Sequence, residues 1–211
     1  PGDTCSIRGG TYRETVTPAA SGREGAPITF RAYEGETVVV TGADPVTAWT
    51  RHQGDIWKAP MPWDLGKNNQ VFFDGQMLDE ARWPNRVKGQ LLDPEGAKID
   101  SADTAGLICK ALPDGDWTGA VVWALCNSKW PSWTATVTGH DRAAKKLLFP
   151  LPEGVRRFHD PARGGEFYLV GRLGLLDAPG EWFHDAAAKM LYLWPPGGAD
   201  PNQHAVTAKK R

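Results

Sequence analysis

The chain has 211 residues, 41% of them hydrophobic, with 24 glycines, 17 prolines and 10 tryptophans, a composition typical of a turn-rich β protein with one sizeable core or two small ones. Its 24 basic and 25 acidic residues are interspersed and leave a net charge of -1, which excludes a basic surface for nucleic acid. The sequence contains no stretch of about 18 apolar residues, so we expect an all-β protein without a membrane span.

The first 45 residues contain an internal repeat. The segment IRGGTY at residues 7–12 precedes ITFRAY at residues 28–33 by 21 residues. A period of roughly 20 to 25 residues is expected of a solenoid, because successive coils stack similar side chains. We therefore predict that residues 1–45 form the first coils of a right-handed parallel β-helix.

This repeat also predicts a register between the two coils. Ile7 should lie beneath Ile28, and Tyr12 should lie near Tyr33, with parallel pairing between their strands. Each coil buries its apolar side only against its neighbours, and about three coils are needed for stability. We therefore expect the remainder of a larger β-helix chain to complete the solenoid.

Residues 46–176 contain eight of the ten tryptophans and have the pattern of short antiparallel strands with frequent turns. The apolar segments 71–73 and 76–78 are separated by Asp74 and Gly75 alone. Asp-Gly favours a two-residue hairpin, since both central positions of that turn need a positive φ. We predict a Trp-rich β domain here, inserted into the β-helix.

A second repeat links the end of this region to the C-terminal part, residues 177–211. HDRAAKKL at residues 140–147 matches HDAAAKML at residues 184–191, and His159-Asp160 begins a looser third copy. The His-Asp pairs suggest zinc or iron ligands. Aspartate at the entrance of a turn also accepts backbone N–H bonds about two residues on. We prefer the turn, so we predict twin hairpins and no metal site.

The three cysteines have no metal-binding spacing. Cys109 and Cys126 flank a turn-rich segment and lie on strands that are able to pair, which allows a disulfide. An odd number of cysteines is equally consistent with buried free thiols. Both alternatives remain open from the sequence.

Several tryptophans are candidates for carbohydrate binding. An indole ring packs on the C–H face of a sugar, while neighbouring Asp, Asn, Arg or Gln side chains bind the hydroxyl groups. Most tryptophans of a β domain instead fill the core, and the alternation around Trp182 and Trp194 predicts that these two pack inward. The candidate carbohydrate-binding residues are Trp83 with Arg82 and Asn85, Trp123, and the WPSW pair Trp130 and Trp133.

An ordered series of short motifs spans nearly the whole chain: PGDT at 1–4, GTY at 10–12, PITF at 27–30, VFFDG at 71–75, ARWPN at 81–85, PGEWF at 179–183 and LYLWPP at 191–196. The series resembles the N-terminal part of large right-handed β-helix proteins that act on polysaccharides. Its opening is similar to pectate-lyase-like enzymes, including the alginate lyase and chondroitinase B group. As a whole it is similar to multidomain proteins assigned to glycoside hydrolase family 141.

This resemblance implies that a β domain interrupts the first coils and that residues 204–208 are the strand that returns to the β-helix. It implies a secreted or extracellular parent protein that is a glycoside hydrolase or a polysaccharide lyase, with its signal outside this sequence. The catalytic residues of such proteins lie on later coils, so none is assigned here and we expect this chain alone to be inactive. We predict no cofactor; the alternative is calcium, which such lyases often use to neutralise a uronate carboxylate.

Hydrolysis of a glycosidic bond usually needs two carboxyl groups at a defined separation. The available ones are Asp74, Asp79, Glu80, Asp177 and Glu181, and nothing in the sequence pairs them. We therefore predict recognition of a polysaccharide or oligosaccharide rather than catalysis. The alternative is a structural role, in which the inserted domain caps the open end of the solenoid and prevents edge-to-edge aggregation.

Overall fold

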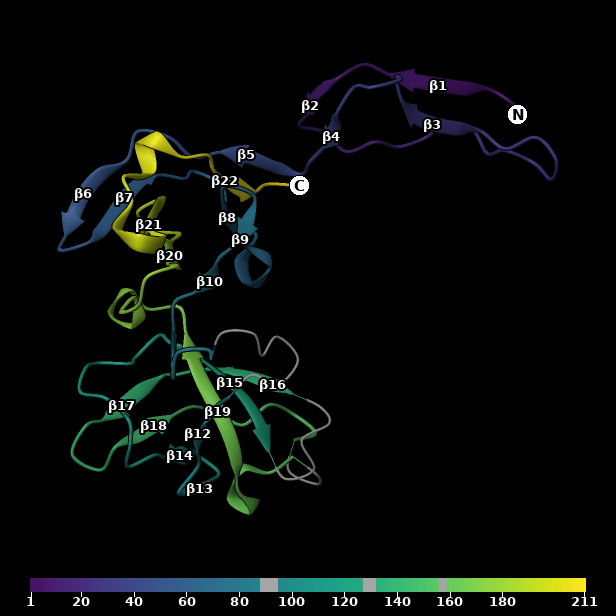
Figure 1. The fold of residues 1–211 in the computed structure, drawn as a ribbon. Helices are drawn as coiled ribbons and strands as arrows, with labels where there is room; N and C mark the ends of the chain where they lie inside the picture. The colour runs from purple at the N-terminus through teal and green to yellow at the C-terminus, as the bar shows by residue number, and fades with distance from the viewer. Residues whose placement is uncertain (88–94, 127–131, 156–158) are drawn as a thin grey trace.

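The computed structural model describes residues 1–87, 95–126, 132–155 and 159–211. These residues form β-strands and 3-10 helices of three residues each, with no α-helix among them, which confirms the all-β prediction. No helix in the described part of the chain is long and apolar enough to cross a membrane. Figure 1 shows three groups of strands: an N-terminal pair of small sheets and two larger β units.

The N-terminal group consists of two parallel two-stranded sheets. One pairs β1 (Thr4–Ile7) with β3 (Thr29–Ala32), and the other pairs β2 (Gly10–Tyr12) with β4 (Val38–Val40). The predicted parallel pairing is confirmed. Two such sheets do not make a solenoid, so the β-helix itself stays a prediction.

The predicted register of these strands is wrong. Ile7 pairs with Ala32 rather than Ile28, and Tyr12, which was expected near Tyr33, pairs with Val40. Most side chains of β1 to β4 are exposed, and burial of one face is what specifies a register. Without a buried face, similarity of side chains does not decide which residues pair.

Unit I combines a five-stranded sheet, in the order β10-β20-β21-β7-β6, with a four-stranded sheet, in the order β5-β22-β8-β9. Neighbouring strands are antiparallel except for the parallel pair β10 and β20. Its elements are β5 (Ala43–Pro45), β6 (Thr50–Gln53), β7 (Ile56–Pro60), η1 (Gly66–Asn68), β8 (Val71–Phe73), β9 (Gln76–Met77), β10 (Asp79–Glu80), β20 (Glu181–Asp185), β21 (Met190–Trp194), η4 (Pro196–Gly198), η5 (Pro201–Gln203) and β22 (Val206–Lys209).

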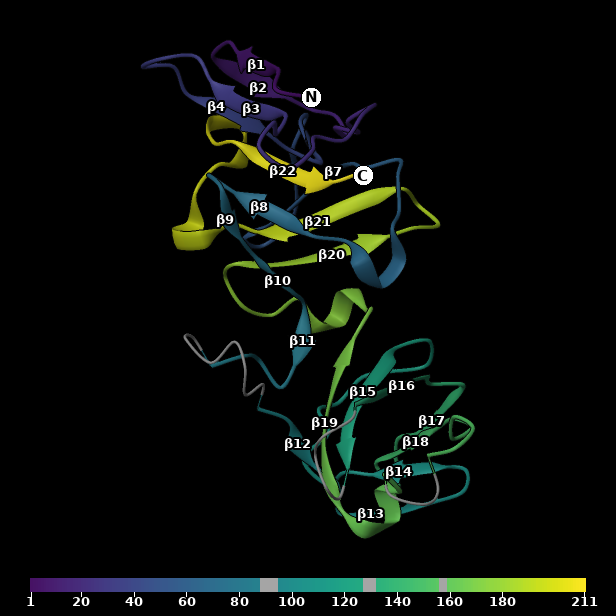
Figure 2. The same ribbon diagram turned by 90° about the vertical axis from the view of Figure 1, so that its right-hand side faces the viewer.

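Unit II is entirely antiparallel. A sheet in the order β11-β19-β15-β16, with β12 also paired to β19, lies near a four-stranded sheet in the order β13-β14-β18-β17 (Figure 2). Its elements are β11 (Arg82–Trp83), β12 (Ala97–Lys98), β13 (Ser101–Asp103), β14 (Gly106–Ile108), β15 (Val121–Cys126), β16 (Trp133–Thr136), β17 (Gly139–Asp141), β18 (Lys146–Leu148), η2 (Pro161–Arg163), β19 (Gly165–Val170) and η3 (Leu173–Leu175).

Each unit has its own hydrophobic core. The buried residues of unit II lie within 81–176, whereas those of unit I come from 46–73 and 182–208. The chain therefore passes from unit I to unit II after β10 and returns before β20. The core of unit I is shared by two segments that are far apart in sequence. The division of the chain at residues 45 and 176 stays a prediction.

The predicted Asp-Gly hairpin is confirmed. Strands β8 and β9 are antiparallel, with Phe73 paired to Gln76. The two residues between them have positive φ angles, 48° at Asp74 and 78° at Gly75, as this turn requires.

The twin hairpins are also confirmed. Oδ1 of Asp141 accepts the Ala144 N–H at 3.0 Å between β17 and β18, and Oδ1 of Asp185 accepts the Ala188 N–H at 2.9 Å between β20 and β21. Each bond spans three residues rather than two. Each turn ends on a lysine with a positive φ angle, which is 50° at Lys145 and 54° at Lys189.

The third His-Asp copy is not a hairpin. Asp160 precedes η2, and its Oδ1 accepts the Ala162 N–H at 2.8 Å. Proline at position 161 has a φ suited to the first turn of a helix, so the chain turns into a short helix instead of a second strand. The aspartate still acts through turn chemistry.

The cysteines are free thiols. Cys109 and Cys126 are buried and Cys5 is exposed. Burial raises the pKa of the Cys126 thiol to about 11, so the thiol stays protonated and behaves as a small apolar side chain. Of the two alternatives left open by the sequence, the structure therefore shows the free thiols.

Candidate functional site

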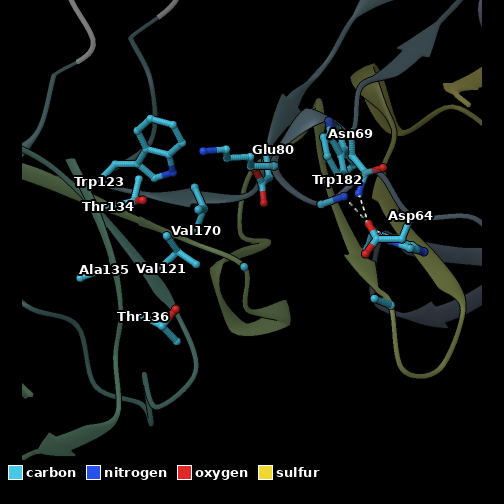
Figure 3. Close-up of a pocket in the computed structure, with 15 residues that line it drawn as sticks. Asp64, Asn69, Glu80, Val121, Trp123, Thr134, Ala135, Thr136, Val170 and Trp182 are labelled. Atoms are coloured by element: carbon cyan, nitrogen blue, oxygen red, sulfur yellow. Dashed lines mark hydrogen bonds and ion pairs between the residues drawn. The ribbon is translucent and has the colours of Figure 1, made fainter. Parts of the chain in front are cut away.

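A cleft of about 450 Å³ is lined by residues of both units. Unit I contributes the loop around η1, strand β10 and the hairpin of β20, while unit II contributes β15, β16 and the end of β19. Figure 3 shows the side chains of the two walls facing each other. A concave site with apolar walls and a few polar groups is the usual form of a small-ligand site.

The wall of unit II is the outward face of its main sheet. Residues of β15 alternate between buried and half-buried, so Val122 and Ala124 pack in the core while Trp123 lies on the other face. Trp123 is paired with Tyr168 on β19 and with Thr134 on β16. The indole and phenol rings stack with centroids 6.0 Å apart and 5° between their planes. The paired strands thus hold the indole in a defined orientation at the cleft.

Arg82 extends this row of side chains. Its guanidinium carbon lies 4.0 Å from the centroid of the Tyr168 ring, a cation–π contact. Its Nε donates to the Pro84 carbonyl at 2.8 Å, and Nη2 donates to the Glu95 carbonyl. Only 6% of Arg82 is exposed, so this arginine supports Tyr168 and the adjacent loops.

The wall of unit I contains a carboxylate with several partners. Oδ1 of Asp64 accepts the Asn69 side-chain amide at 2.6 Å and the Gly66 N–H at 2.9 Å. His184 Nδ1 lies 3.5 Å from the same oxygen. These donors, Asn69 first, hold the pKa of Asp64 below its usual value. Asp64 is therefore a charged, anchored group at neutral pH.

His184 connects this carboxylate to the core of unit I. Its Nε2 lies 3.0 Å from the carbonyl oxygen of Met61. A carbonyl oxygen only accepts hydrogen bonds, so Nε2 carries the proton in this contact. The imidazole thus connects the Asp64 loop to Met61, the residue that follows β7.

Glu80 is the second carboxyl group of the cleft. It lies on β10 beside Trp182 of β20 and is half-buried. No hydrogen bond or ion pair reaches its carboxyl from the residues that the structure describes. Burial raises its pKa to about 7. Two carboxyl groups with pKa values moved in opposite directions are typical of functional clefts.

Some of the carbohydrate-binding residues predicted from the sequence lie at the cleft and others do not. Trp123 lines the cleft, and Arg82 reaches the same aromatic row. Backbone carbonyls and the Tyr168 ring already contact the Arg82 guanidinium, so a direct role of this arginine in sugar binding stays a prediction. Asn85 is exposed, and its side-chain amide donates to Asp177 Oδ1 at 2.9 Å.

Two other tryptophans face the core of unit II. Trp83 is half-buried with its ring centroid 6.1 Å from that of Phe167. Trp133 is 8% exposed, and its Nε1 donates to the His159 carbonyl at 3.1 Å. Trp133, one of the candidates for packing on a sugar, is buried because it pairs with Ala124 on the buried face of the sheet. Trp130 lies outside the described residues.

Most residues of the cleft were not predicted from the sequence. Glu80 was noted as an unpaired carboxyl and His184 only as part of a His-Asp pair at a turn, and Asp64 and Tyr168 were not singled out. The alternation of β15 and β19 was the available signal for Trp123 and Tyr168, since both lie one position away from buried residues. Among the described residues, no three His, Cys, Asp or Glu side chains form a group able to hold a metal ion.

The fold of this chain is similar to that of a solved structure. No protein-family model matches the chain. A solved structure described as "Glycoside hydrolase" has the same fold with a TM-score of 0.72 and 24% identity, over 97% of this chain and 38% of that one. A second, the structure of XylC with xylose, is 19% identical with a TM-score of 0.42, which is too low to support an argument.

A curated relative matches a short segment. The uncharacterized protein YwoF of Bacillus subtilis (strain 168) is 51% identical over 47 residues, which are 22% of this chain and 10% of YwoF. The chain thus spans well under half the length of YwoF and of the glycoside hydrolase.

Proposed function

We propose that this chain recognises a polysaccharide or oligosaccharide in the cleft between units I and II. The observation that carries the proposal is the arrangement of the walls. An oriented indole, Trp123, lies on one wall, and polar side chains that include Asn69 and Glu80 lie on the other. An aromatic face combined with a few fixed polar groups suits the apolar faces and the hydroxyl edge of a sugar ring.

The fold supports a role within a larger carbohydrate-active protein. It is shared with a solved glycoside hydrolase that is much longer than this chain. We propose an extracellular parent protein, a glycoside hydrolase or a polysaccharide lyase, in which β1 to β4 start a parallel β-helix. The exposed apolar side chains Phe30, Val39 and Val40 are consistent with further coils that would cover them.

Replacement of Trp123 tests the site. Trp123→Ala should weaken saccharide binding about fivefold or more, since a stacked ring contributes about 1 kcal/mol beyond its buried area. A glycan array of neutral and acidic polysaccharides identifies the ligand, and affinity electrophoresis measures the change. Trp83→Ala is the matched control because its ring packs toward the core, so it should reduce stability and leave the affinity of the folded protein unchanged. If Trp83→Ala abolished binding and Trp123→Ala left it unchanged, the binding site would lie at Trp83 rather than in the cleft.

A structural cap is the second candidate function. Nη2 of Arg211 donates to the Arg13 carbonyl at 2.6 Å, and Nη1 of Arg13 donates to the Ala43 carbonyl at 2.5 Å. These bonds join unit I to the N-terminal sheets, as a cap on a solenoid would require. The absence of binding to any glycan would favour this role over recognition.

A further inference from the structure

We propose that Glu80 determines which sugars the cleft accepts: its carboxyl binds adjacent hydroxyl groups of a neutral saccharide and disfavours uronic acids. This inference rests on the proposed carbohydrate recognition. It goes further by naming the class of ligand and the residue that selects it.

The first argument is the difference between the two carboxyl groups of the cleft. Asp64 already accepts hydrogen bonds from Asn69 and Gly66. The carboxyl of Glu80 has no partner among the described residues, although it is half-buried on a regular strand. Its oxygens reach the solvent of the cleft, so they are free to accept hydrogen bonds from the hydroxyl groups of a ligand, whereas Oδ1 of Asp64 is already occupied.

The second argument is the position of Glu80 relative to the aromatic wall. Figure 3 shows Trp123 and Glu80 on different sides of the cleft. A ring that packs its C–H face on the indole presents its hydroxyl groups at its edge. The two oxygens of a carboxylate are able to accept two such hydroxyls, and hydrogen bonds to a charged acceptor are stronger than neutral ones.

The third argument is the charge around Glu80. A uronate would bring its carboxylate close to Asp64 and Glu80, and like charges in a partly buried site repel. The charges of Asp64 and Lys67, which are both exposed, are screened by solvent, so the half-buried carboxyl of Glu80 decides the selectivity. Other charged and titratable groups surround Glu80. Those in the cleft are Asp64, Lys67 and His184. Those on neighbouring elements are Asp79 on β10, Arg86 in the loop after β11, Arg82 on β11, Tyr168 on β19 and Glu181 on β20.

The fourth argument concerns pH. Burial raises the pKa of Glu80 to about 7, so the group is largely protonated at pH 5.5 and largely ionised at pH 8. The ionised form is the better acceptor for hydroxyls. Affinity for a neutral saccharide should therefore rise as the pH increases through 7, and saccharide binding should lower the pKa of Glu80.

The experiment compares the whole chain with Glu80→Gln and with Asp79→Asn. The probes are neutral hexasaccharides of glucose, xylose and mannose and hexasaccharides of galacturonate and guluronate, measured by calorimetry at pH 5.5, 7 and 8. Asp79→Asn is the matched control because Asp79 precedes Glu80 on β10, pairs with Arg86 and does not line the cleft.

We expect the wild type to bind a neutral hexasaccharide at least tenfold more tightly than the uronates, with affinity rising about tenfold from pH 5.5 to 8. Glu80→Gln should lose most of the pH dependence and of the selectivity, and Asp79→Asn should keep both. Carbon NMR of the wild-type Glu80 carboxyl gives a second measurement, since saccharide should lower its pKa.

Two outcomes overturn the inference while the proposed function stands. One is saccharide binding whose selectivity and pH profile are unchanged in Glu80→Gln, and the other is a preference for uronates. Failure of the wild type to bind any saccharide overturns both the inference and the proposed function.

Discussion

Glu181 is a buried carboxyl group at the start of β20. It is 4% exposed, and its Oε2 lies 3.4 Å from the Asp177 N–H that donates to it. Burial, together with the nearby Asp177 carboxylate, raises the pKa of Glu181 to about 8. The side chain is therefore mostly protonated in the folded protein at pH 7 and ionised in the unfolded chain.

This difference predicts how stability depends on pH. The unfolded chain binds fewer protons than the folded one between the unfolded pKa of 4.5 and about 8. The free energy of unfolding should therefore fall as pH rises through this window, by up to about 1.4 kcal/mol per pH unit from Glu181. Glu181→Gln cannot ionise, so it should flatten this slope and unfold at higher urea concentrations than the wild type at pH 8.

Urea denaturation at pH 5, 6.5 and 8 measures this effect. Glu153→Gln, at an exposed position, is the control and should follow the wild type. The part of the slope that comes from Glu80 is present in all three proteins. A slope in Glu181→Gln equal to that of the wild type would show that Glu181 ionises normally.

The twin hairpins test the turn chemistry at the level of the element. Asp141 and Asp185 each accept one backbone N–H at the same position of equivalent turns. Asp→Ala at either site should lower the free energy of unfolding by about 1 kcal/mol. The hairpins belong to different units, so the effects should add in the double variant to within about 0.5 kcal/mol.

Chemical denaturation of the two single variants and the double variant checks this prediction. Asp→Asn at the same positions keeps a side-chain oxygen acceptor, so its loss should be smaller than that of alanine. Equal losses for asparagine and alanine would mean that the charge, rather than the turn hydrogen bond, is what matters there.

At the scale of the whole molecule, the three groups of strands differ in how well they are buried. The two larger units each enclose an apolar core. The N-terminal strands β1 to β4 form two-stranded sheets with mostly exposed side chains. Such sheets are marginally stable in water unless something packs on them.

Hydrogen exchange should reproduce this order in the isolated chain. Amides of β15, β19 and β21 should exchange slowly, because they lie in central strands over a core. Amides of β1 to β4 should exchange much faster. Equal protection of β1 and β15 would show that the N-terminal sheets are stabilised by contacts other than those of the described structure.

The cleft depends on the arrangement of the whole chain. Its walls bring together Asp64, Glu80, Trp123 and His184, which lie up to 120 positions apart in the sequence. The placement depends on the chain leaving unit I after β10 and returning at β20. Pairing of distant strands is set by the packing of whole sheets, so no local pattern pointed to this group of residues.

Features that depend on neighbouring residues were predictable from the sequence alone. The Asp74-Gly75 turn, the turns at Asp141 and Asp185 and the all-β class follow from backbone preferences and short-range hydrogen bonds. The period of the N-terminal repeat was enough to predict parallel pairing of its strands, because the strands of stacked coils run in the same direction.

The register of these coils and the roles of the tryptophans depend instead on tertiary packing. Trp123 and Trp133 lie on paired strands, yet one faces the cleft and the other the core. Residues on both faces of this sheet are partly apolar, so alternation alone does not identify the buried face. That choice is made by the sheet that packs against it, whose residues are distant in sequence and close only in the folded chain.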